Sequence, residues 1–230
     1  MIRLGTIYGG WSIPSKNNLN KNSIVYSAGV GEDISFDLQL QSKYHCNLFL
    51  IDPTIKAKKH FNECINFFND KSYTFTGNIQ KDYYTNINSL HPNFDNIKYL
   101  DIGLWNKKDT LKFYKQTNKN YVSQSLINGM FGKEYDIVHV DSIKNIMMKH
   151  GHNKIDLLKL DIEGAEIKVL EQMLNDNIYP KYLCIEFDLF LKKKDFDKST
   201  SKIIQKLENN GYKIVVNDKM NITFEYQKTQ

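Results

Sequence analysis

Short apolar runs alternate with amphipathic segments along most of the chain. The apolar runs have the length of strands, and many are bounded by glycine, proline, asparagine or aspartate. They predict strands at residues 24–28, 47–51, 97–104, 110–114, 135–140, 155–160, 182–187, 212–216 and 222–226. The amphipathic segments predict helices at about 32–44, 54–69, 142–150, 165–175 and 198–209. Strands that alternate with helices favour an α/β fold, in which helices cover both faces of a mostly parallel sheet.

The helix expected at 54–69 has the clearest periodic pattern. Its apolar positions recur at the spacing of one helical face: Ile55, Ala57, His60, Phe61, Cys64, Ile65 and Phe68. Pro53 stops the preceding strand, and its fixed φ suits the opening of a helix, with Thr54 beside it. The last two apolar runs lie close together, so we expect the sheet to end in an antiparallel hairpin.

Other segments have weaker patterns. Residues 1–22 predict an irregular lead-in that packs on the domain, with the Trp11 ring suited either to covering a cofactor or, as we favour, to capping the core. Residues 70–96 predict a polar loop that contains a short helix and a candidate strand at 73–76. The runs at 97–104 and 110–114 flank a polar turn, which predicts a hairpin.

Composition narrows the class of protein. The 230 residues are 41% hydrophobic and 13% aromatic, which suits one domain spanning residues 1–230. The formal charge of +5 is mild and diffuse, so we expect no nucleic-acid partner, although an anionic acceptor such as a sugar nucleotide is compatible with it. Nothing in the pattern defines an oligomeric state.

The cysteines and the apolar runs indicate where the protein works. The three cysteines are odd in number, have no CxxC pair and lie in or beside apolar runs, which favours buried thiols in a reducing compartment. No apolar run approaches the roughly 20 residues that span a bilayer, and the start lacks the apolar core of a signal peptide. We therefore expect a soluble, cytoplasmic protein.

The unusual residues of the chain lie at the ends of its predicted strands. They are Gly29 and Gly31, Asp52, Asp161 and Glu163, and Glu186 and Asp188. In open parallel sheets, ligands bind beyond the carboxyl ends of the strands. The two glycines let a cofactor approach the backbone, and a carboxylate at Asp52 can accept two hydrogen bonds from ribose hydroxyls. The pattern therefore predicts a nucleotide-like cofactor at this edge of the sheet.

The residues of the glycine turn disfavour a dinucleotide. The third glycine of a GxGxxG motif would fall at Ile34, where a side chain would crowd a pyrophosphate. Glu32 and Asp33 would repel the same pyrophosphate where the helix opens. A cationic cofactor with an amino-acid tail, such as S-adenosylmethionine, suits this acidic turn better. A nicotinamide-dependent oxidoreductase is the rival enzyme class, and a non-catalytic module that keeps the cofactor pocket is a third alternative.

Several motifs together resemble the FkbM-type family of S-adenosylmethionine-dependent methyltransferases, in the family's order and over nearly the whole chain. They are Tyr8-Gly9-Gly10-Trp11, Val25-Tyr-Ser-Ala-Gly-Val-Gly-Glu-Asp-Ile-Ser-Phe-Asp37, Asp52-Pro53, Gly103-Leu104-Trp105, Tyr121-Val-Ser-Gln-Ser-Leu126, Asp156-Leu-Leu-Lys-Leu-Asp-Ile-Glu-Gly-Ala-Glu166 and Glu186-Phe187. The phrase from Lys159 to Glu166 is the most specific of them. The resemblance implies a seven-stranded class I methyltransferase fold and O-methylation of a small-molecule or glycan acceptor, often a sugar hydroxyl.

The resemblance also implies roles for individual residues. The strand and turn around Ser27, Gly29, Gly31, Glu32 and Asp33 would hold the methionine end of the cofactor, and Asp52, followed by Pro53, would hold the ribose. Gly103, Leu104 and Trp105 would border the adenine, and Ser123 and Ser125 would touch cofactor or acceptor. One position departs from the family pattern, because Asp188 stands where a histidine is expected after Glu186-Phe187. That departure puts the family's general base in doubt in this chain.

Methyl transfer to a hydroxyl needs a base that removes the hydroxyl proton, and four carboxylates are candidates. They are Asp161, Glu163, Glu186 and Asp188, with Asp161 also a candidate for cofactor binding. Glu163 has an alternative role as an acid that stabilises the start of its helix. Asp161 with Asp188 or Glu186 is also a hard oxygen set of the type that Mg²⁺ accepts. After transfer, S-adenosylhomocysteine would be the product.

Overall fold

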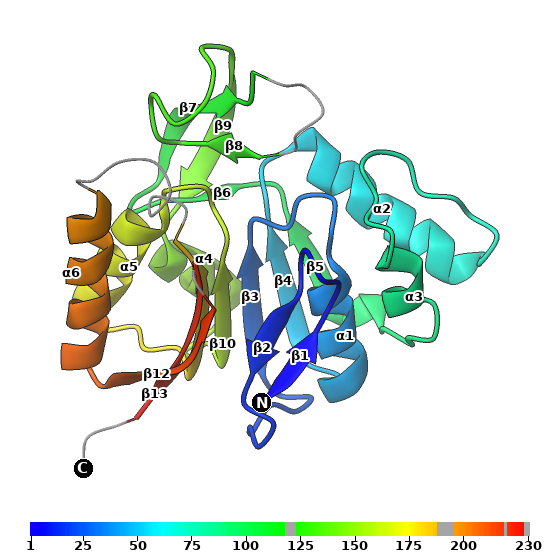
Figure 1. Cartoon of the computed structure of the whole chain (residues 1–230), viewed down its shortest axis with the longest axis horizontal. Helices are drawn as coiled ribbons and strands as arrows, with labels where there is room; N and C mark the ends of the chain where they lie inside the picture. Colours follow the sequence, from blue (N-terminus) through cyan, green and yellow to red (C-terminus); the bar gives the residue numbers. More distant parts are fainter. Residues whose placement is uncertain (118–122, 188–195, 219, 228–230) are drawn as a thin grey trace.

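A seven-stranded sheet forms the centre of the protein in the computed structural model (Figure 1). The structure describes residues 1–117, 123–187, 196–218 and 220–227. Six strands run in one direction: β3 (Ile24–Ala28), β4 (Asn47–Ile51), β5 (Ile97–Leu100), β10 (Leu157–Leu160), β11 (Tyr182–Glu186) and β12 (Tyr212–Asp218). The seventh, β13 (Asn221–Tyr226), is antiparallel to both neighbours, in the order β12-β13-β11-β10-β3-β4-β5. The expected mostly parallel sheet and its closing antiparallel hairpin are confirmed.

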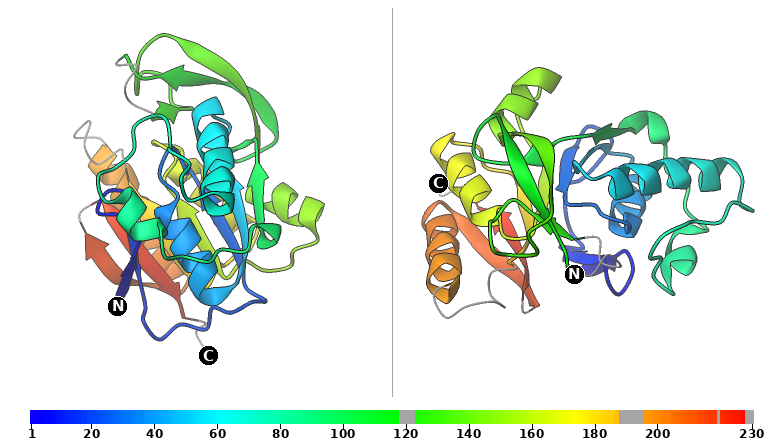
Figure 2. Two further views of the ribbon diagram at one scale, coloured as in Figure 1. Left: turned by 90° about the vertical axis from the view of Figure 1, so that its right-hand side faces the viewer. Right: turned by 90° about the horizontal axis from the view of Figure 1, so that it is seen from above.

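Helices cover both faces of this sheet (Figure 2). One face is covered by α1 (Ser35–Tyr44), α2 (Ile55–Asn69) and α3 (Tyr83–Ile87), and the other by α4 (Ile143–His150), α5 (Glu166–Asn175) and α6 (Phe196–Asn209). A short 3-10 turn, η1 (Phe94–Asn96), precedes β5. The hydroxyl of Thr54 caps α2 by accepting a hydrogen bond from the Ala57 amide, and Ser142 caps α4 in the same way. The helices expected from periodicity are therefore confirmed to within a few residues.

A second, four-stranded sheet stands above the carboxyl ends of the central strands (Figure 1). Its order is β6 (Gly103–Leu104), β9 (Tyr135–Asp141), β7 (Asp109–Lys115) and β8 (Gln124–Ser125). The prediction of a hairpin between 97–104 and 110–114 is wrong. The first run divides between β5 of the large sheet and β6 of the small one, and β7 pairs with β9 instead. Pairing with β9 places β7 beside the buried Val138 and Val140, which a local turn could not provide.

Two other segments differ from expectation. The lead-in is not wholly irregular, since β1 (Ile2–Leu4) and β2 (Trp11–Ile13) form an antiparallel pair. Trp11 is buried in the core, as expected of a cap. The candidate strand at 73–76 is absent, because the amide of Phe75 donates to the Tyr84 hydroxyl and that of Thr76 to the Glu63 carboxylate. Side chains there take the hydrogen bonds that a neighbouring strand would provide.

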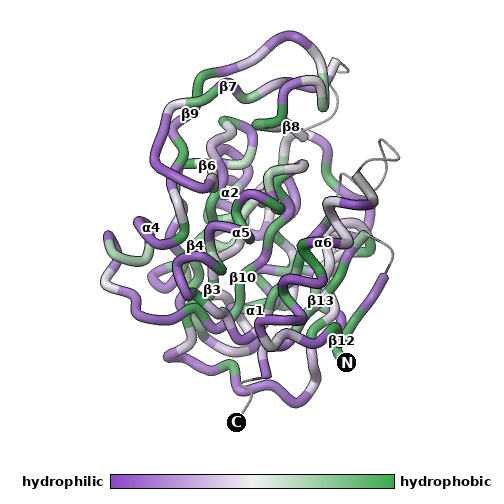
Figure 3. The backbone as a smooth tube through the Cα atoms, turned by 90° about the vertical axis from the view of Figure 1, so that its left-hand side faces the viewer, coloured by the Kyte–Doolittle hydropathy of each residue, from purple (hydrophilic) through white to green (hydrophobic). Residues whose placement is uncertain are grey.

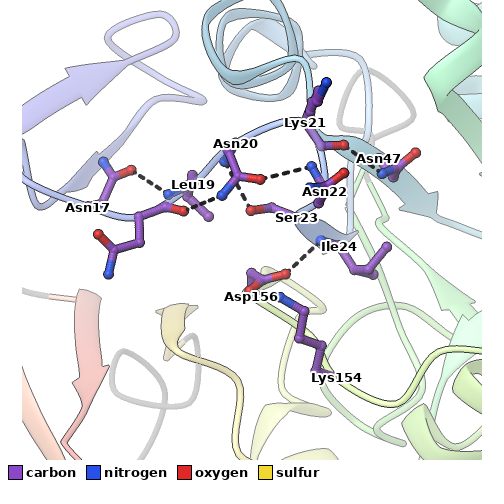
Figure 4. A network of polar contacts seen from close by, with 11 residues as sticks. Asn17, Leu19, Asn20, Lys21, Asn22, Ser23, Ile24, Asn47, Lys154 and Asp156 are labelled. Atoms are coloured by element: carbon purple, nitrogen blue, oxygen red, sulfur yellow. Dashed lines mark hydrogen bonds and ion pairs between the residues drawn. The ribbon is translucent and has the colours of Figure 1, made fainter.

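A polar network at the amino ends of the central strands fixes the start of β3 (Figure 4). The carboxylate of Asp156 accepts a hydrogen bond from the Ile24 amide at 2.8 Å and pairs with Lys154 through its other oxygen. The side chain of Asn47 donates to the Lys21 carbonyl at 3.1 Å, so β4 is joined to the same loop. These contacts tie the amino ends of β3 and β4 to the neighbouring segments. They thereby help to fix the position of the glycine turn at the carboxyl end of β3.

Two apolar layers flank the sheet, and hydrophobic segments gather inside the molecule while the connecting loops are mostly hydrophilic (Figure 3). All three cysteines are buried and unpaired, as expected. No helix within the described residues is long and apolar enough to cross a membrane.

Candidate functional site

A cavity of about 310 Å³ lies between the carboxyl ends of the central strands and the second sheet. Its floor comes from the segments that follow β3, β4 and β10, and its roof from β6, β7 and the β8 segment. The lining residues predicted from the sequence are Gly29, Gly31, Glu32, Asp33, Asp52, Pro53, Gly103, Leu104, Ser123, Asp161 and Glu163. A cavity of this size is sufficient for a small-molecule or cofactor site. The strand ends singled out by the sequence therefore open into one space.

The glycine turn has a backbone that other residues rarely adopt. Gly29 and Gly31 have φ values of +74° and +52°. A β-carbon at Gly29 would lie 1.6 Å from the carbonyl oxygen of Asp161, so the turn after β3 packs directly on the segment after β10. Gly29 is thus required by the fold itself, in addition to any approach by a cofactor.

Asp52 organises the same turn from below. One carboxylate oxygen accepts hydrogen bonds from the amides of Val30 and Gly31 at 3.0 and 3.1 Å. The other accepts from the amide and the hydroxyl of Thr54 at 2.8 and 2.6 Å. Burial raises the pKa of Asp52, and these four hydrogen bonds oppose the increase. The side chain is 5% exposed and also lines the cavity, but the four hydrogen bonds of the turn already occupy the acceptor positions of its carboxylate, so the predicted contact with ribose hydroxyls has no acceptor left in this arrangement.

Asp52→Asn should therefore destabilise the protein as well as weaken cofactor binding. The side-chain amide of asparagine has one acceptor oxygen, and its NH₂ group would face the other donors of the turn. Two of the buried donors that now bind the Asp52 carboxylate would therefore lose their acceptor. We expect a loss of about 2–4 kcal/mol in the free energy of unfolding, measured by urea titration. Asp101→Asn removes a half-exposed ion pair with Lys58 and should cost less than about 1 kcal/mol. Equal losses in the two variants would contradict the role of Asp52 in the turn.

Glu32 and Asp33 line the cavity and also hold neighbouring loops. Asp33 accepts a hydrogen bond from the Thr6 hydroxyl at 2.6 Å, and its other oxygen accepts from the amide and hydroxyl of Ser35. A β-carbon at Gly77 would lie 2.2 Å from the Glu32 carboxylate, so the loop before α3 packs closely on this side chain. The acidic turn thereby fixes both loops beside the cavity.

A carboxyl pair stands at the ends of β10 and β11. The side chains of Asp161 and Glu186 lie within hydrogen-bonding reach of each other. Burial and the negative charge of Asp161 raise the pKa of Glu186 to about 8, and the Lys159 ammonium opposes the increase. Asp161 lines the cavity, whereas Glu186 is not among its lining residues. At neutral pH the pair therefore holds a proton on Glu186, next to the carboxylate of Asp161.

Glu166 has a structural role at the start of α5. It is buried, and one carboxyl oxygen accepts hydrogen bonds from the amides of Ile162 and Gly164 at 3.0 and 3.1 Å. Burial raises the pKa of Glu166 to about 8. Glu163, three residues earlier, has a φ of +54°, and its carbonyl accepts a hydrogen bond from the Ser125 hydroxyl. Glu166 and Ser125 together hold the segment after β10 in shape.

These raised pKa values predict a fall in stability between about pH 5 and pH 8. Folded Glu166 and Glu186 keep their protons up to about pH 8, whereas the same groups titrate near 4.5 when unperturbed. Since the unfolded chain binds fewer protons in this range, the free energy of unfolding decreases as pH rises. Glu166→Gln keeps an acceptor oxygen without the charge and should reduce the slope, measured by urea unfolding at pH 5.5 and 8. The exposed Glu208→Gln is the control, and an unchanged slope in Glu166→Gln would exclude the raised pKa of Glu166 as its source.

Some predicted residues do not reach the cavity. Ser27 is fully buried within β3, and Ser125 is fully buried beneath Glu163, so neither lines it. The ring of Trp105 also lies outside the lining, with the Lys168 ammonium 5.8 Å from its centre. The structure therefore places these three side chains outside the cavity lining, although the sequence predicted that they contact the cofactor or the acceptor. Asp188 lies outside the described residues.

The sequence did not predict the other lining residues, which are Tyr8, Gly9, Val30, Ile51, Thr54, Asn78, Gln80, Phe113, Gln124, Leu126, Lys159 and Ile162. Many of these are neighbours of motif residues, but Asn78 and Gln80 come from a polar loop with no periodic signal. Lys159 had a signal, since it is a lysine within an otherwise apolar buried strand. Such a residue is rarely buried without a partner.

The structure does not support the expected Mg²⁺ site among the residues that it describes. Across the described ranges, no group of three or more histidine, cysteine, aspartate or glutamate side chains is placed to hold a metal ion. Asp188, one of the expected ligands, is outside those ranges.

The charged groups of the cavity suit S-adenosylmethionine. Five acidic side chains line it, against the single cation Lys159 among the described residues. The cofactor has a sulfonium, an ammonium and a carboxylate, and no phosphate that these acids would repel. The close-packed glycine turn also leaves backbone exposed on the cavity side. The residues present therefore fit a cationic cofactor with an amino-acid tail.

The strand order, with one antiparallel strand inserted near the edge and a cofactor cavity at the carboxyl ends, defines a class I methyltransferase. The chain matches the family model "Methyltransferase FkbM domain" over residues 12–214. It therefore belongs to the FkbM methyltransferase family, whose members use S-adenosylmethionine. The resemblance carried by the sequence motifs is confirmed.

Solved structures with similar folds are distant. An rRNA methylase from Streptococcus thermophilus is 10% identical with a TM-score of 0.43, covering 91% of this chain and 90% of its own. A human methyltransferase 10 domain containing protein is 9% identical with a TM-score of 0.44, and the match covers 96% of this chain and 77% of that protein's chain. Aeropyrum pernix fibrillarin with bound S-adenosyl-L-methionine is 10% identical with a TM-score of 0.39, and the match covers 90% of this chain and 66% of the fibrillarin chain. No curated protein matches the chain. The assignment therefore depends on the family match.

Proposed function

We propose that this protein transfers a methyl group from S-adenosylmethionine to a hydroxyl of an uncharged carbohydrate acceptor. The observation that carries the proposal is the carboxylate of Asp161, which opens into the same cavity as the glycine turn and is backed by Glu186. When bound, S-adenosylmethionine supplies an electrophilic methyl group on a positively charged sulfur. A hydroxyl oxygen becomes an adequate nucleophile once a base removes its proton.

In this mechanism Asp161 is the general base. Its carboxylate would accept the proton of the acceptor hydroxyl as that oxygen takes the methyl group that bound S-adenosylmethionine would supply, with S-adenosylhomocysteine as the leaving group. Glu186 acts through Asp161, because a shared proton orients the carboxylate and limits the charge of the pair. Asp33 and Asp52 keep the glycine turn in place, so that the two reactants are aligned.

The charge of the site supports an uncharged acceptor. Glu32, Asp33 and Glu163 join Asp161 on the wall of the cavity, and the cation Lys159 lies on its floor. Phosphates of a sugar nucleotide or a nucleic acid would meet repulsion from the described lining. Sugar hydroxyls carry no such charge and suit carboxylate and amide groups such as those of Asn78 and Gln80.

The test is release of S-adenosylhomocysteine in a panel of acceptors. Neutral glycosides and oligosaccharides should give turnover above sugar nucleotides, and RNA should give none. Turnover with RNA or with phosphorylated sugars alone would overturn the acceptor class. Thermal shift with S-adenosylhomocysteine and with NAD tests the cofactor separately, since stabilisation by NAD alone would exclude methyl transfer.

Tyr8 should affect the acceptor and not the cofactor. Its side chain is 72% exposed and lines the cavity, and a hydrogen bond from the Gly9 amide to the Thr6 hydroxyl fixes its loop. An aromatic face at an opening of this kind can stack on a sugar ring. Tyr8→Ala should raise the acceptor KM about tenfold through lost stacking area and leave the affinity for S-adenosylhomocysteine within about twofold. Tyr8→Phe keeps the ring and is the control, and a matching loss of cofactor affinity in Tyr8→Ala would contradict this role.

A further inference from the structure

Lys159 is a buried cation on the floor of an acidic cavity. It is the third residue of β10, is 3% exposed, and lines the cavity beside the glycine turn. The methyl-transfer step described above uses the neighbouring carboxylates and gives this ammonium no contact with a ligand. Moving an ammonium out of water is costly unless partners compensate for it. The partners of Lys159 therefore indicate what it can still bind.

The ammonium of Lys159 is only partly engaged within the described structure. It donates one hydrogen bond to the Gly29 carbonyl at 2.8 Å and forms a long ion pair with Asp161 at 3.6 Å. The ring of Trp11 lies 6.0 Å away, at the limit of a cation–π contact. Burial opposes the charge, but the carboxylates of Asp161 and Asp37 raise the pKa of Lys159, so it stays protonated. An ammonium has three N–H donors, so donor capacity remains for a ligand.

We infer that Lys159 binds the carboxylate at the methionine end of S-adenosylmethionine. The inference rests on the proposed function for the identity of the cofactor. The cofactor carboxylate must enter a cavity whose other charged lining residues, among those described, are all acidic. Within the described lining, only Lys159 offers it an opposite charge, and the hydrogen bond to Gly29 places that charge at the turn expected to hold the amino-acid tail. Lys159 would thus orient the cofactor by its tail while the acids attract its cationic groups.

The unmodified protein provides the first test. Decarboxylated S-adenosylmethionine lacks the carboxylate and carries one more net positive charge than S-adenosylmethionine. An acidic cavity without a carboxylate site would bind this analogue at least as tightly. If Lys159 binds the carboxylate, calorimetric titration should show the analogue binding about tenfold or more weakly. Equal or tighter binding of the analogue would overturn the inference, and this comparison does not depend on whether any variant folds.

Variants then assign the effect to one side chain. Lys159→Met should weaken binding of S-adenosylhomocysteine about tenfold and change binding of 5′-methylthioadenosine, which lacks the amino-acid tail, by less than about twofold. Lys159→Arg keeps the charge and should retain most of the affinity. Lys181→Met is the matched control, because Lys181 also pairs with a backbone carbonyl (Tyr226, 2.8 Å) and a carboxylate (Glu225, 3.0 Å) but lies outside the cavity.

The two ligands separate a binding role from a structural one. Equal losses for S-adenosylhomocysteine and 5′-methylthioadenosine in Lys159→Met would mean that the lysine only supports the turn, and would overturn the inference. Unchanged affinity for both would overturn it as well. If the unmodified protein binds neither ligand, the proposed cofactor fails. If it binds both, and Lys159→Met does not distinguish them, only the role of Lys159 fails.

Discussion

Gly29→Ala should abolish cofactor binding and strongly destabilise the fold. A β-carbon there would lie 1.6 Å from the Asp161 carbonyl oxygen and 2.6 Å from its carbon. Both are backbone atoms at the end of β10, so no side-chain rotation can relieve the collision. The turn and the segment from Asp161 would have to separate, which opens the floor of the cavity. We expect a loss of about 4 kcal/mol or more in the free energy of unfolding.

A matched control separates this collision from the cost of positive φ. Gly151 has a φ of +69°, close to the +74° of Gly29, but a β-carbon there would meet no atom within 4 Å. Gly151→Ala should therefore cost only about 1–2 kcal/mol, the penalty of an L-residue in the left-handed region. Urea unfolding measures both variants, and thermal shift with S-adenosylhomocysteine reports binding. Similar losses in the two variants would show that conformation, and not contact with Asp161, makes Gly29 necessary.

Local sequence patterns were sufficient for the large sheet. Each central strand is a short apolar run, and the helix at Ile55–Asn69 has both a periodic face and a cap. The second sheet was not predicted, because its pairing joins β7 to β9 across some 20 residues. The turn at Asn106–Asp109 favours a local hairpin equally well, and only the burial of Val138 and Val140 decides between the two partners. Long-range pairing of short, half-exposed strands leaves little trace in local sequence.

The residues of the site also divide into those that local sequence predicts and those that depend on tertiary contacts. Strand ends such as Gly29, Asp52 and Asp161 were identifiable because a parallel sheet brings its carboxyl ends together. Ser27 and Ser125 share motifs with lining residues, but Ser27 is fully buried on one face of the sheet and Ser125 packs under Glu163. Motif membership does not state the direction of a side chain. The roof and the residues at Asn78 and Gln80 depend on tertiary contacts of loops, which composition does not determine.

Several residues of the site serve both stability and chemistry. Asp52 accepts four hydrogen bonds that close the turn, Asp33 holds the N-terminal loop, and Lys159 bridges the Gly29 carbonyl and Asp161. A loss of activity after substitution is therefore ambiguous unless folding is measured with it. Variants of Asp161 escape this ambiguity best, because its side chain is partly exposed to the cavity.

Asp161→Asn should slow methyl transfer about 10²–10⁴-fold and leave cofactor affinity within about threefold. An amide of the same shape cannot take the hydroxyl proton, whereas the main-chain contact with Gly29 is retained. Turnover with the best acceptor of the carbohydrate panel and calorimetric binding of S-adenosylhomocysteine give the two quantities. Asp141→Asn is the matched control, since Asp141 also ends a strand and accepts hydrogen bonds from Ser142 and Asn145 outside the cavity.

The pH dependence of turnover then distinguishes the base from its partner. Glu186 has a pKa raised to about 8, first by burial and then by the charge of Asp161. When Glu186 loses its proton, it can no longer share that proton with Asp161, whose carboxylate is then free to accept the hydroxyl proton, so wild-type turnover should rise with pH through about 8. Glu186→Gln cannot ionise, and should remove this rise while retaining part of the activity at pH 7. If turnover of Glu186→Gln follows the wild-type pH profile, the carboxyl pair does not control the base, and Asp161 acts alone.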